Sequence, residues 1–174
     1  MPTATIRAYV ENAKLIVKEK NKIYLAIGKN TPWNNENIPP MPEEEADDLE
    51  EIIGFKKMST VSLCRPLRDG ETTVHPKVKY LGKTWVLVPE DKAQEEEAFH
   101  VYFSVRINPE DMPLGEYRQV GVYTGIEEGK EIYIPTDEEV KNRILYFYDN
   151  RRQFNRTEQV SVTESFIINT RNTI

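Results

Sequence analysis

The sequence has one cysteine, Cys64, and two histidines, His75 and His100. A single cysteine cannot form an internal disulfide, and this usage is typical of a reducing compartment. A zinc site requires several Cys or His ligands at close spacing, and these three residues are far apart in the sequence. His100 lies on the polar side of an alternating segment and His75 precedes Pro76 in a predicted turn, so each is interpreted as a surface residue rather than a general base. The sequence therefore predicts no metal site and no cofactor.

Long hydrophobic runs are also missing. No run of about 18 apolar residues exists, and residues 1–22 interrupt their apolar positions with charges. We therefore expect neither a transmembrane helix nor a secretory signal. A membrane is not an expected partner, and the protein is expected to mature in the cytoplasm.

Positive charge is in deficit, with 23 Lys and Arg against 29 Asp and Glu and a formal charge of -6. This balance argues against nonspecific attraction to nucleic acid or to an anionic membrane. One basic segment, residues 149–156, contains Arg151, Arg152 and Arg156 around Phe154. Three arginines in an acidic chain are weak evidence for nucleic acid, and arginine is equally suited to protein interfaces. Protein partners are expected, and nucleic acid is not.

The sequence lacks the loops that hold phosphates or present nucleophiles. Its eight glycines are scattered in predicted turns, with no GxGxxG, no GKS or GKT and no nucleophile elbow. Any two of the 29 carboxylates could meet in space as in a glycosidase, but that abundance makes the signal unspecific. No catalytic residue is identified, and the protein is not expected to be an enzyme.

The composition is that of a folded chain with a charged surface, since 39% of the 174 residues are hydrophobic and 30% are charged. No repeat of fixed length and no Gly/Ser-rich linker interrupts it. We predict one β-rich domain over residues 1–174, whose portion 1–54 carries a helix and an arm. Residues 3–19 place apolar side chains at steps of three and four, which predicts an amphipathic helix. Its apolar stripe could cover the protein's own sheet or pack on a like helix in a homodimer.

The segment after this helix contains a β-prone stretch, then a proline-rich stretch, then an acidic stretch. Residues 22–29 are β-prone and end near Gly28, after which four prolines, the last of them Pro42, favour extended or turn conformations. This part is predicted to be an ordered loop or a docking arm. A second, short acidic helix is predicted at 42–54, because proline and carboxylates are favoured in a first helical turn. Its consecutive carboxylates lack the spacing of a calcium loop and are interpreted as a solvated face.

Alternation of apolar and polar residues dominates the rest of the chain. Residues 99–107 follow the period of two expected of a half-buried strand. Hairpins are expected at 77–89 and 117–135, each joined where glycine can supply a positive φ. Further strands are predicted at 59–67, 144–149 and 159–168. The pattern predicts a mainly β fold, an antiparallel β-sandwich or a partly open barrel with an N-terminal amphipathic helix and a second short acidic helix.

The two tryptophans suggest different roles. Trp85 lies in the apolar run 84–88 and is interpreted as a core residue. Trp33 lies among prolines and asparagines, in a segment predicted to be neither helix nor sheet. It could pin the arm to the protein's own sheet, fill a pocket on a neighbouring protein, or stack on a sugar.

Three stretches add a resemblance. The first, IYLAIGKNTPWNNENIPPMP, combines an aliphatic strand, a glycine, a basic residue, Pro-Trp and Pro-Pro-x-Pro. The second, EYRQVGVYTG, places an Arg-Gln pair before a small apolar run. The third, YDNRRQFNRTEQVSVTESFII, contains Asn-Arg, a polar stretch and a final strand. In this order they resemble the baseplate wedge subunits of contractile-tailed bacteriophages, although this chain is considerably shorter than the better-known wedge subunit.

This resemblance implies a mostly antiparallel β fold, no catalysis, and a connector that links tail parts to peripheral fibres or spikes. The expected partners are other baseplate or tail proteins, and the expected location is the tail baseplate of the virion. The residues expected to bind partners are Pro32, Trp33, Pro39, Pro40, Arg151 and Arg152. Three alternatives stay open: a connector at the neck of the tail, a carbohydrate-binding adsorption module of β-sandwich type, and a hydrolase of cell-wall polymer.

Overall fold

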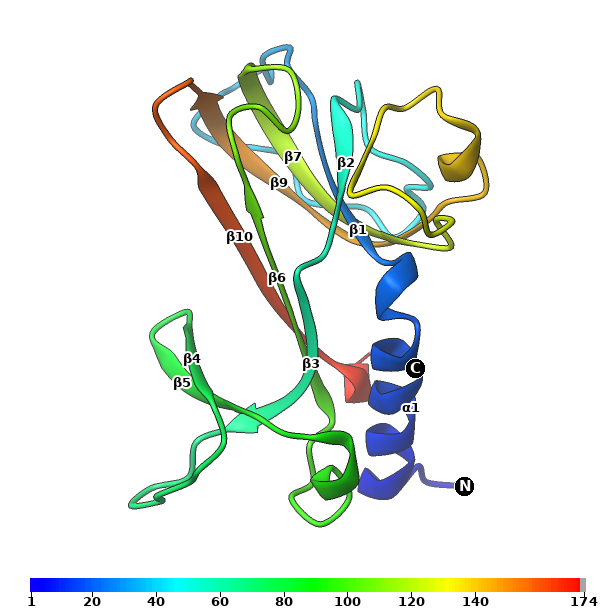
Figure 1. Cartoon of the computed structure of the whole chain (residues 1–174), viewed down its shortest axis with the longest axis vertical. Helices are drawn as coiled ribbons and strands as arrows, with labels where there is room; N and C mark the ends of the chain where they lie inside the picture. Colours follow the sequence, from blue (N-terminus) through cyan, green and yellow to red (C-terminus); the bar gives the residue numbers. More distant parts are fainter. Residues whose placement is uncertain (173–174) are drawn as a thin grey trace. The chain divides into compact units, whose positions relative to one another are not determined.

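A computed structural model describes residues 1–172, which form one α-helix, ten strands and four short 3₁₀ turns (Figure 1). The helix is α1 (Ile6–Lys18). The strands are β1 (Tyr24–Gly28), β2 (Gly54–Lys57), β3 (Thr60–Pro66), β4 (Lys77–Tyr80), β5 (Lys83–Leu87), β6 (His100–Ile107), β7 (Gly115–Thr124), β8 (Ile132–Tyr133), β9 (Ile144–Arg156) and β10 (Val162–Asn169). The 3₁₀ turns are η1 (Lys20–Lys22), η2 (Glu90–Lys92), η3 (Glu138–Val140) and η4 (Thr170–Asn172). The mainly β fold is confirmed.

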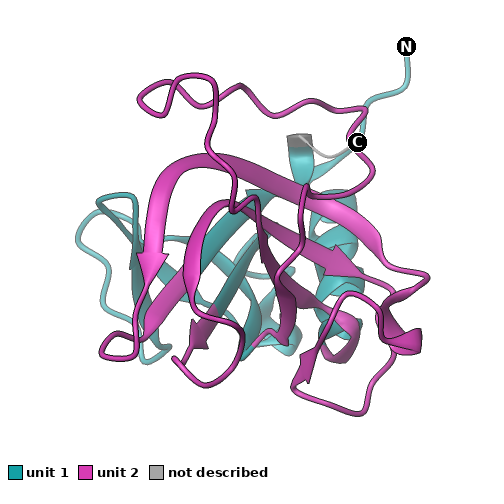
Figure 2. Cartoon of the chain, turned by 90° about the horizontal axis from the view of Figure 1, so that it is seen from above, with its two compact units in different colours: residues 1–20, 59–104, 165–174 teal, residues 21–58, 105–164 magenta. Residues whose placement is uncertain are grey.

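The chain forms two compact units (Figure 2). Unit 1 comprises residues 1–20, 59–104 and those from 165 onward, and unit 2 comprises residues 21–58 and 105–164. Unit 2 contains a five-stranded antiparallel sheet of order β8-β2-β1-β7-β9. A second antiparallel sheet has the order β10-β6-β3-β5-β4, and unit 1 contains α1, β3, β4, β5 and the greater part of β6 and β10.

The N-terminal helix is confirmed, and it begins and ends close to the predicted bounds. The Thr5 hydroxyl accepts a hydrogen bond from the Ala8 N–H at 3.3 Å, which caps the first turn. Val10 and Ala13 on the apolar stripe are fully buried, and the helix contacts β3 within unit 1. The stripe therefore covers the helix's own unit.

The strongest strand predictions are also confirmed in unit 1. Buried and less buried residues alternate along β6, as its sequence period predicts. The hairpin of β4 and β5 turns through Leu81 and Gly82, whose φ angles are 47° and 77°. Two successive positive φ angles define a type I′ turn, which matches the twist of the flanking strands.

The other predicted hairpin, at 117–135, is wrong. β7 pairs with β1 on one side and β9 on the other, so it has no free side for β8. The chain after Thr124 instead carries β8 to the outer side of β2, where Phe55 pairs with Tyr133. The core of unit 2 lies beneath these strands and contains Tyr24, Ala26, Leu49, Phe55, Tyr123, Ile126, Tyr133 and Val140.

The second short acidic helix predicted at 42–54 is also wrong, because this stretch consists of turns, bends and irregular backbone before β2 begins at Gly54. Several of its backbone N–H groups bond to side chains of the sheet. The N–H of Leu49 donates to the Tyr123 hydroxyl at 2.9 Å, and the N–H of Glu50 donates to the Gln119 side chain at 2.7 Å. These long-range bonds replace the local bonds that a helix would use, so packing overrides helix propensity here.

Candidate functional site

The most distinctive feature of unit 2 is the segment of residues 29–53, hereafter the arm, which joins β1 to β2. The two ends of the arm are held together where it leaves the sheet. The N–H of Lys29 donates to the Glu50 carbonyl, and the N–H of Ile53 donates to the Ile27 carbonyl, both at 2.8 Å. A long loop with joined ends can be packed by its own side chains and hold a defined surface.

Arg118 on β7 holds the first half of the arm. Its side chain is 1% exposed, and its Nε donates to the Glu36 carboxylate at 2.8 and 3.0 Å. The guanidinium also donates to the Asn30 carbonyl at 2.6 Å and to Glu116 at 3.0 Å. A buried guanidinium is costly unless its donors are satisfied, and here two of its three acceptor groups come from the arm. The hydrogen bond with Glu36 raises the pKa of Arg118 and lowers the pKa of the Glu36 carboxyl.

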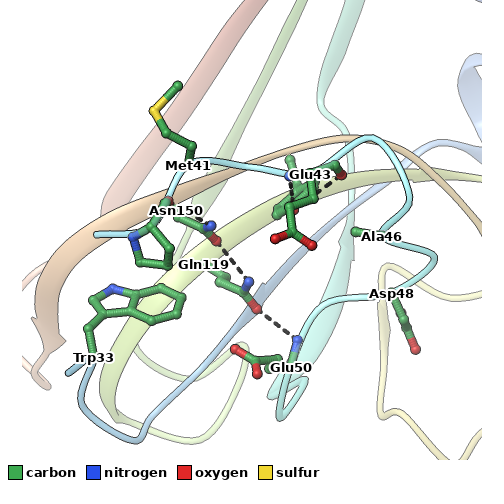
Figure 3. Close-up of a pocket in the computed structure, with 10 residues that line it drawn as sticks. Trp33, Met41, Glu43, Ala46, Asp48, Glu50, Gln119 and Asn150 are labelled. Carbon is green, nitrogen blue, oxygen red and sulfur yellow. Dashed lines mark hydrogen bonds between the residues drawn. The ribbon is translucent and has the colours of Figure 1, made fainter. Parts of the chain in front are cut away.

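Gln119, the next residue, connects the second half of the arm to β9. Its carbonyl oxygen accepts the Glu50 N–H, and its amide nitrogen donates to the Asn150 side chain at 2.8 Å. Asn150 in turn donates to the Pro40 carbonyl at 3.0 Å. Figure 3 shows Gln119 between Asn150 and Glu50 in this chain of bonds. The side-chain amides of Gln119 and Asn150 therefore each hold one backbone group of the arm in place.

Trp33 attaches the arm to β9. Its indole Nε1 donates to the Arg151 carbonyl at 2.8 Å, and its ring is half-buried. The Lys29 ammonium lies 5.1 Å from the ring centroid, a cation–π distance. This direct contact supports the interpretation of Trp33 as an anchor that holds the arm on the protein's own sheet.

A third group of contacts holds the second half of the arm. The Tyr123 hydroxyl donates to Asp48, and Arg143 donates to the same carboxylate at 2.7 Å. Burial by itself would raise the pKa of Asp48, but the hydrogen bonds from Arg143 and Tyr123 outweigh it and hold that pKa below its ordinary value. The arm is therefore fixed to the sheet near both of its ends and in the middle.

A pocket of about 290 Å³ lies between the arm and the sheet (Figure 3). Trp33 stands at one end of it, and Asp48 stands at the other. Its lining consists of Trp33, Pro40, Met41, Glu43, Ala46, Asp48, Glu50, Gln119, Tyr148 and Asn150. Three carboxylates and no lysine or arginine belong to this lining, so it is an acidic pocket with an aromatic end.

The prolines predicted to bind partners lie on the arm. Pro32 and Pro40 are exposed and Pro39 is half-buried. Beside them the arm exposes two large apolar side chains, Ile38 at 72% and Met41 at 83%. The outer side of the arm is therefore apolar in places, although the inner side is bonded to the sheet.

The predicted basic segment is part of β9, and its arginines differ in environment. Arg151 donates to Glu164 at 2.6 Å and to Asp149 at 3.1 Å, and Arg152 is exposed. Arg156 is 2% exposed and donates to the Asn108 carbonyl at 2.8 Å. The three arginines thus form no continuous basic patch.

β9 carries an irregularity where the arm meets it. The pairing of β7 with β9 passes from Tyr117 and Phe154 directly to Gln119 and Asn150. Residues 151–153 therefore lie opposite Arg118 alone, which makes a bulge of two extra residues. The bulge contains the Arg151 carbonyl, which accepts the hydrogen bond from the Trp33 indole. Two predicted site residues, Trp33 and Arg151, are therefore in contact.

The residues that hold the arm were not identified from the sequence as a group. In the sequence Arg118 and Gln119 form only a pair of polar residues before an apolar run, and no pattern marks Asn150 as an anchor. Two adjacent polar residues inside a strand that is otherwise apolar are the available signal, because buried polar groups must find partners.

The described part of the chain contains no cluster of metal-ligating side chains, and its one cysteine is buried. Among residues 1–172, no group of three or more His, Cys, Asp or Glu side chains could hold a metal ion. Burial of Cys64 raises the pKa of its thiol, so the reactive thiolate is disfavoured. No described helix is long and apolar enough to cross a membrane.

Comparison with known proteins gives two matches. The family model described as "Baseplate wedge 3 tail fiber network component" matches residues 1–170. "Virion protein 3" of Enterococcus phage phiEF24C is 37% identical over 176 residues, which cover 99% of this chain and 97% of that protein.

Proposed function

Because the chain belongs to the family of baseplate wedge 3 tail fiber network components, we propose that it is a non-catalytic connector that docks other tail proteins or fibres on its arm. The observation that carries this proposal is the way in which the arm is held. Buried Arg118 fixes its inner side, and Ile38 stays 72% exposed on its outer side.

A fixed arm is a good docking surface for a physical reason. Binding costs conformational entropy whenever a loop must be ordered, and a loop that is already ordered avoids that cost. The prolines restrict the arm further, and Pro32 and Pro40 are exposed beside Ile38 and Met41. Arg152 extends this surface onto β9 as a charged contact. The resulting patch combines apolar, proline and arginine contacts, as protein interfaces do.

The partners in this proposal are other baseplate proteins, and the protein lies in the baseplate of the virion after assembly in the host cytoplasm. The name of the family model, which refers to a wedge and to a tail fibre network, supports this placement. Gold-labelled antibody on intact virions tests it. Label at the distal end of the tail is expected, and label at the joint of head and tail would move the role to the neck.

The docking role is tested by charged substitution on the arm. Ile38→Glu is compared with Leu15→Glu, which changes an exposed apolar residue on α1 by the same chemistry. Phage lacking the gene is complemented with each variant, and the amount of this protein in purified virions is measured by quantitative mass spectrometry. We expect Ile38→Glu to lower incorporation several-fold and Leu15→Glu to leave it near wild type. Equal incorporation of both variants, with normal tails, would overturn the docking role of the arm.

The adsorption module predicted as an alternative would use the Trp33 ring as its sugar platform. The Lys29 ammonium lies over that ring, and the indole N–H is already bonded to Arg151. A stacked sugar would have to displace the lysine from the face that it covers, which disfavours this role. Glycan binding that is lost in Trp33→Ala and kept in Trp33→Phe would instead support the role as an adsorption module.

A further inference from the structure

We propose that the acidic pocket of one copy of this protein receives the tip of the β4–β5 hairpin of a second copy. The pocket belongs to unit 2 and the hairpin to unit 1, and each copy carries both. The proposal names a partner for the pocket side of the arm. It rests on the proposed function only in treating the arm as a docking surface.

The hairpin tip has an unusual residue at its turn. Leu81 occupies the first central position of the type I′ turn with a φ of 47°, and its side chain is 85% exposed. Asn, Asp or Gly is the ordinary choice there, because a side chain with a Cβ is strained at positive φ. Neither the turn geometry nor burial within the described chain accounts for a leucine. Strain that folding does not require is characteristic of a functional contact.

Positive charge surrounds this leucine. Lys77, Lys79 and Lys83 are all exposed, and no Asp or Glu occurs between Glu71 and Glu90. Figure 1 shows the hairpin as a projection that extends beyond β3. The tip thus presents one apolar side chain between lysines.

The pocket has the complementary composition. Glu43, Asp48 and Glu50 supply carboxylates, and Trp33 supplies apolar surface. Asp48 is already paired with Arg143, so it contributes less to a new partner. Glu50 is 58% exposed and lies 3.5 Å from Lys29, a loose pair. Glu43 and Glu50 are therefore the carboxylates best placed to meet an incoming lysine.

The two units of the chain also carry net charges of opposite sign. Unit 1 contains eleven Lys and Arg and nine Asp and Glu, whereas unit 2 contains twelve and twenty, so their formal charges are +2 and -8 and sum to -6. Complementary charge favours contact between unit 1 of one copy and unit 2 of another, and it opposes contact between like units. Such a contact joins different surfaces, so it gives a ring if the rotation closes and an open row if it does not.

The first test is the association state of the purified chain. Sedimentation velocity over a range of concentrations should show oligomers that dissociate on dilution and at high salt, because exposed charges are screened. A chain that remains a monomer at every concentration overturns the proposal. This test involves no other tail protein, so its failure leaves the docking proposal for Ile38 untouched, and failure of the Ile38 test leaves this one untouched.

Two variants separate the two halves of the contact. Leu81→Asn should weaken association about tenfold or more while leaving the free energy of unfolding equal or higher, since asparagine suits the turn better than leucine. Glu43→Lys combined with Glu50→Lys should weaken association by reversing the pocket charge. Val160→Asn changes another exposed apolar residue and should leave association unchanged.

Mixing the two variants gives the decisive result. The pocket variant keeps a working hairpin, and Leu81→Asn keeps a working pocket, so the mixture should form one-to-one dimers and nothing larger. A mixture that stays monomeric, or a Leu81→Asn chain that associates as tightly as wild type, overturns the proposal.

Discussion

Trp33 and Arg151 lie 118 residues apart in the sequence, and the indole of the first donates a hydrogen bond of 2.8 Å to the backbone carbonyl of the second. This bond joins the arm to the bulge of β9. It connects two elements that the sequence suggested separately as binding surfaces. The arm and the bulge therefore form one surface of unit 2, and changes at either residue should be felt at the other.

Substitution of Trp33 should lower the stability of the protein. Trp33→Phe removes the N–H donor but keeps most of the ring, so we expect a loss of about 1 kcal/mol in the free energy of unfolding. Trp33→Ala should lose about 2 kcal/mol, less than the roughly 3–5 kcal/mol of a fully buried tryptophan, because the ring is half-buried. Urea unfolding of both purified variants measures this. An unchanged stability of Trp33→Ala would assign the ring to a partner instead of to the sheet.

Substitution of Arg118 should release the first half of the arm. Arg118→Lys keeps the charge, but a single ammonium cannot reach Glu36 and the Asn30 carbonyl in the geometry of the guanidinium fork. We expect a loss of about 1–3 kcal/mol, since charge-assisted hydrogen bonds of a buried side chain are lost. Limited proteolysis should cut residues 29–53 faster in this variant. Arg152→Lys is the matched control, and its exposed side chain should leave stability within about 0.5 kcal/mol.

Acid should weaken unit 1 through the ion pairs of Arg65. This arginine is 4% exposed and donates to Glu71 at 2.5 Å and to Glu96 at 2.7 Å. The hydrogen bond from Arg65 lowers the pKa of the Glu71 carboxyl from 4.5 to about 2. A carboxyl whose pKa is lower in the folded state stabilises the fold fully above its unfolded pKa, and this contribution disappears as the pH falls through the folded value.

The stability contributed by Glu71 should therefore be complete above about pH 4.5 and disappear progressively toward about pH 2. Chemical unfolding of the wild type and of Glu71→Gln across this range measures the effect. We expect a shallower decline in the variant, because its neutral amide does not titrate. Parallel curves would show that Glu71 has the same pKa in the folded and unfolded states.

The single thiol should report the opening of unit 1. Cys64 is fully buried, and burial raises the pKa of its thiol. We expect the folded protein to react with a thiol reagent such as Ellman's reagent far more slowly than the protein in urea. Fast labelling without urea would mean that β3 opens readily, and Cys64→Ser labelled in parallel gives the background.

The parts of the fold that the sequence predicted well depend on local periodicity. Residues 3–19 and 99–107 repeat at helical and strand periods, and both predictions are confirmed. The acidic stretch 42–54 also looked helical locally, but its N–H groups bond to Tyr123 and Gln119 on a distant strand. No local pattern encodes such bonds, so propensity gave the wrong answer there.

The candidate site was predictable in the same partial way. Trp33 stood out by its surroundings in the sequence, and its anchoring function was one of the alternatives. The polar pair of Arg118 and Gln119 has a meaning only when the arm is placed over β7, because their acceptors come from residues far away in the chain. The arginines near Arg151 look alike in sequence but differ in burial, because Arg151 and Arg152 lie in the bulge whereas Arg156 is paired and buried beyond it.

The bulge at residues 151–153 has one more consequence. β9 is thirteen residues long and is the outermost strand of its sheet, with β7 as its only strand neighbour among the described residues. A long regular outer strand is a template on which further chains can add as strands and grow into aggregates. Two extra residues break the even spacing of its backbone groups, and the Trp33 indole occupies the carbonyl of Arg151. The irregularity that receives the arm thus also makes this edge a poorer template for an added strand.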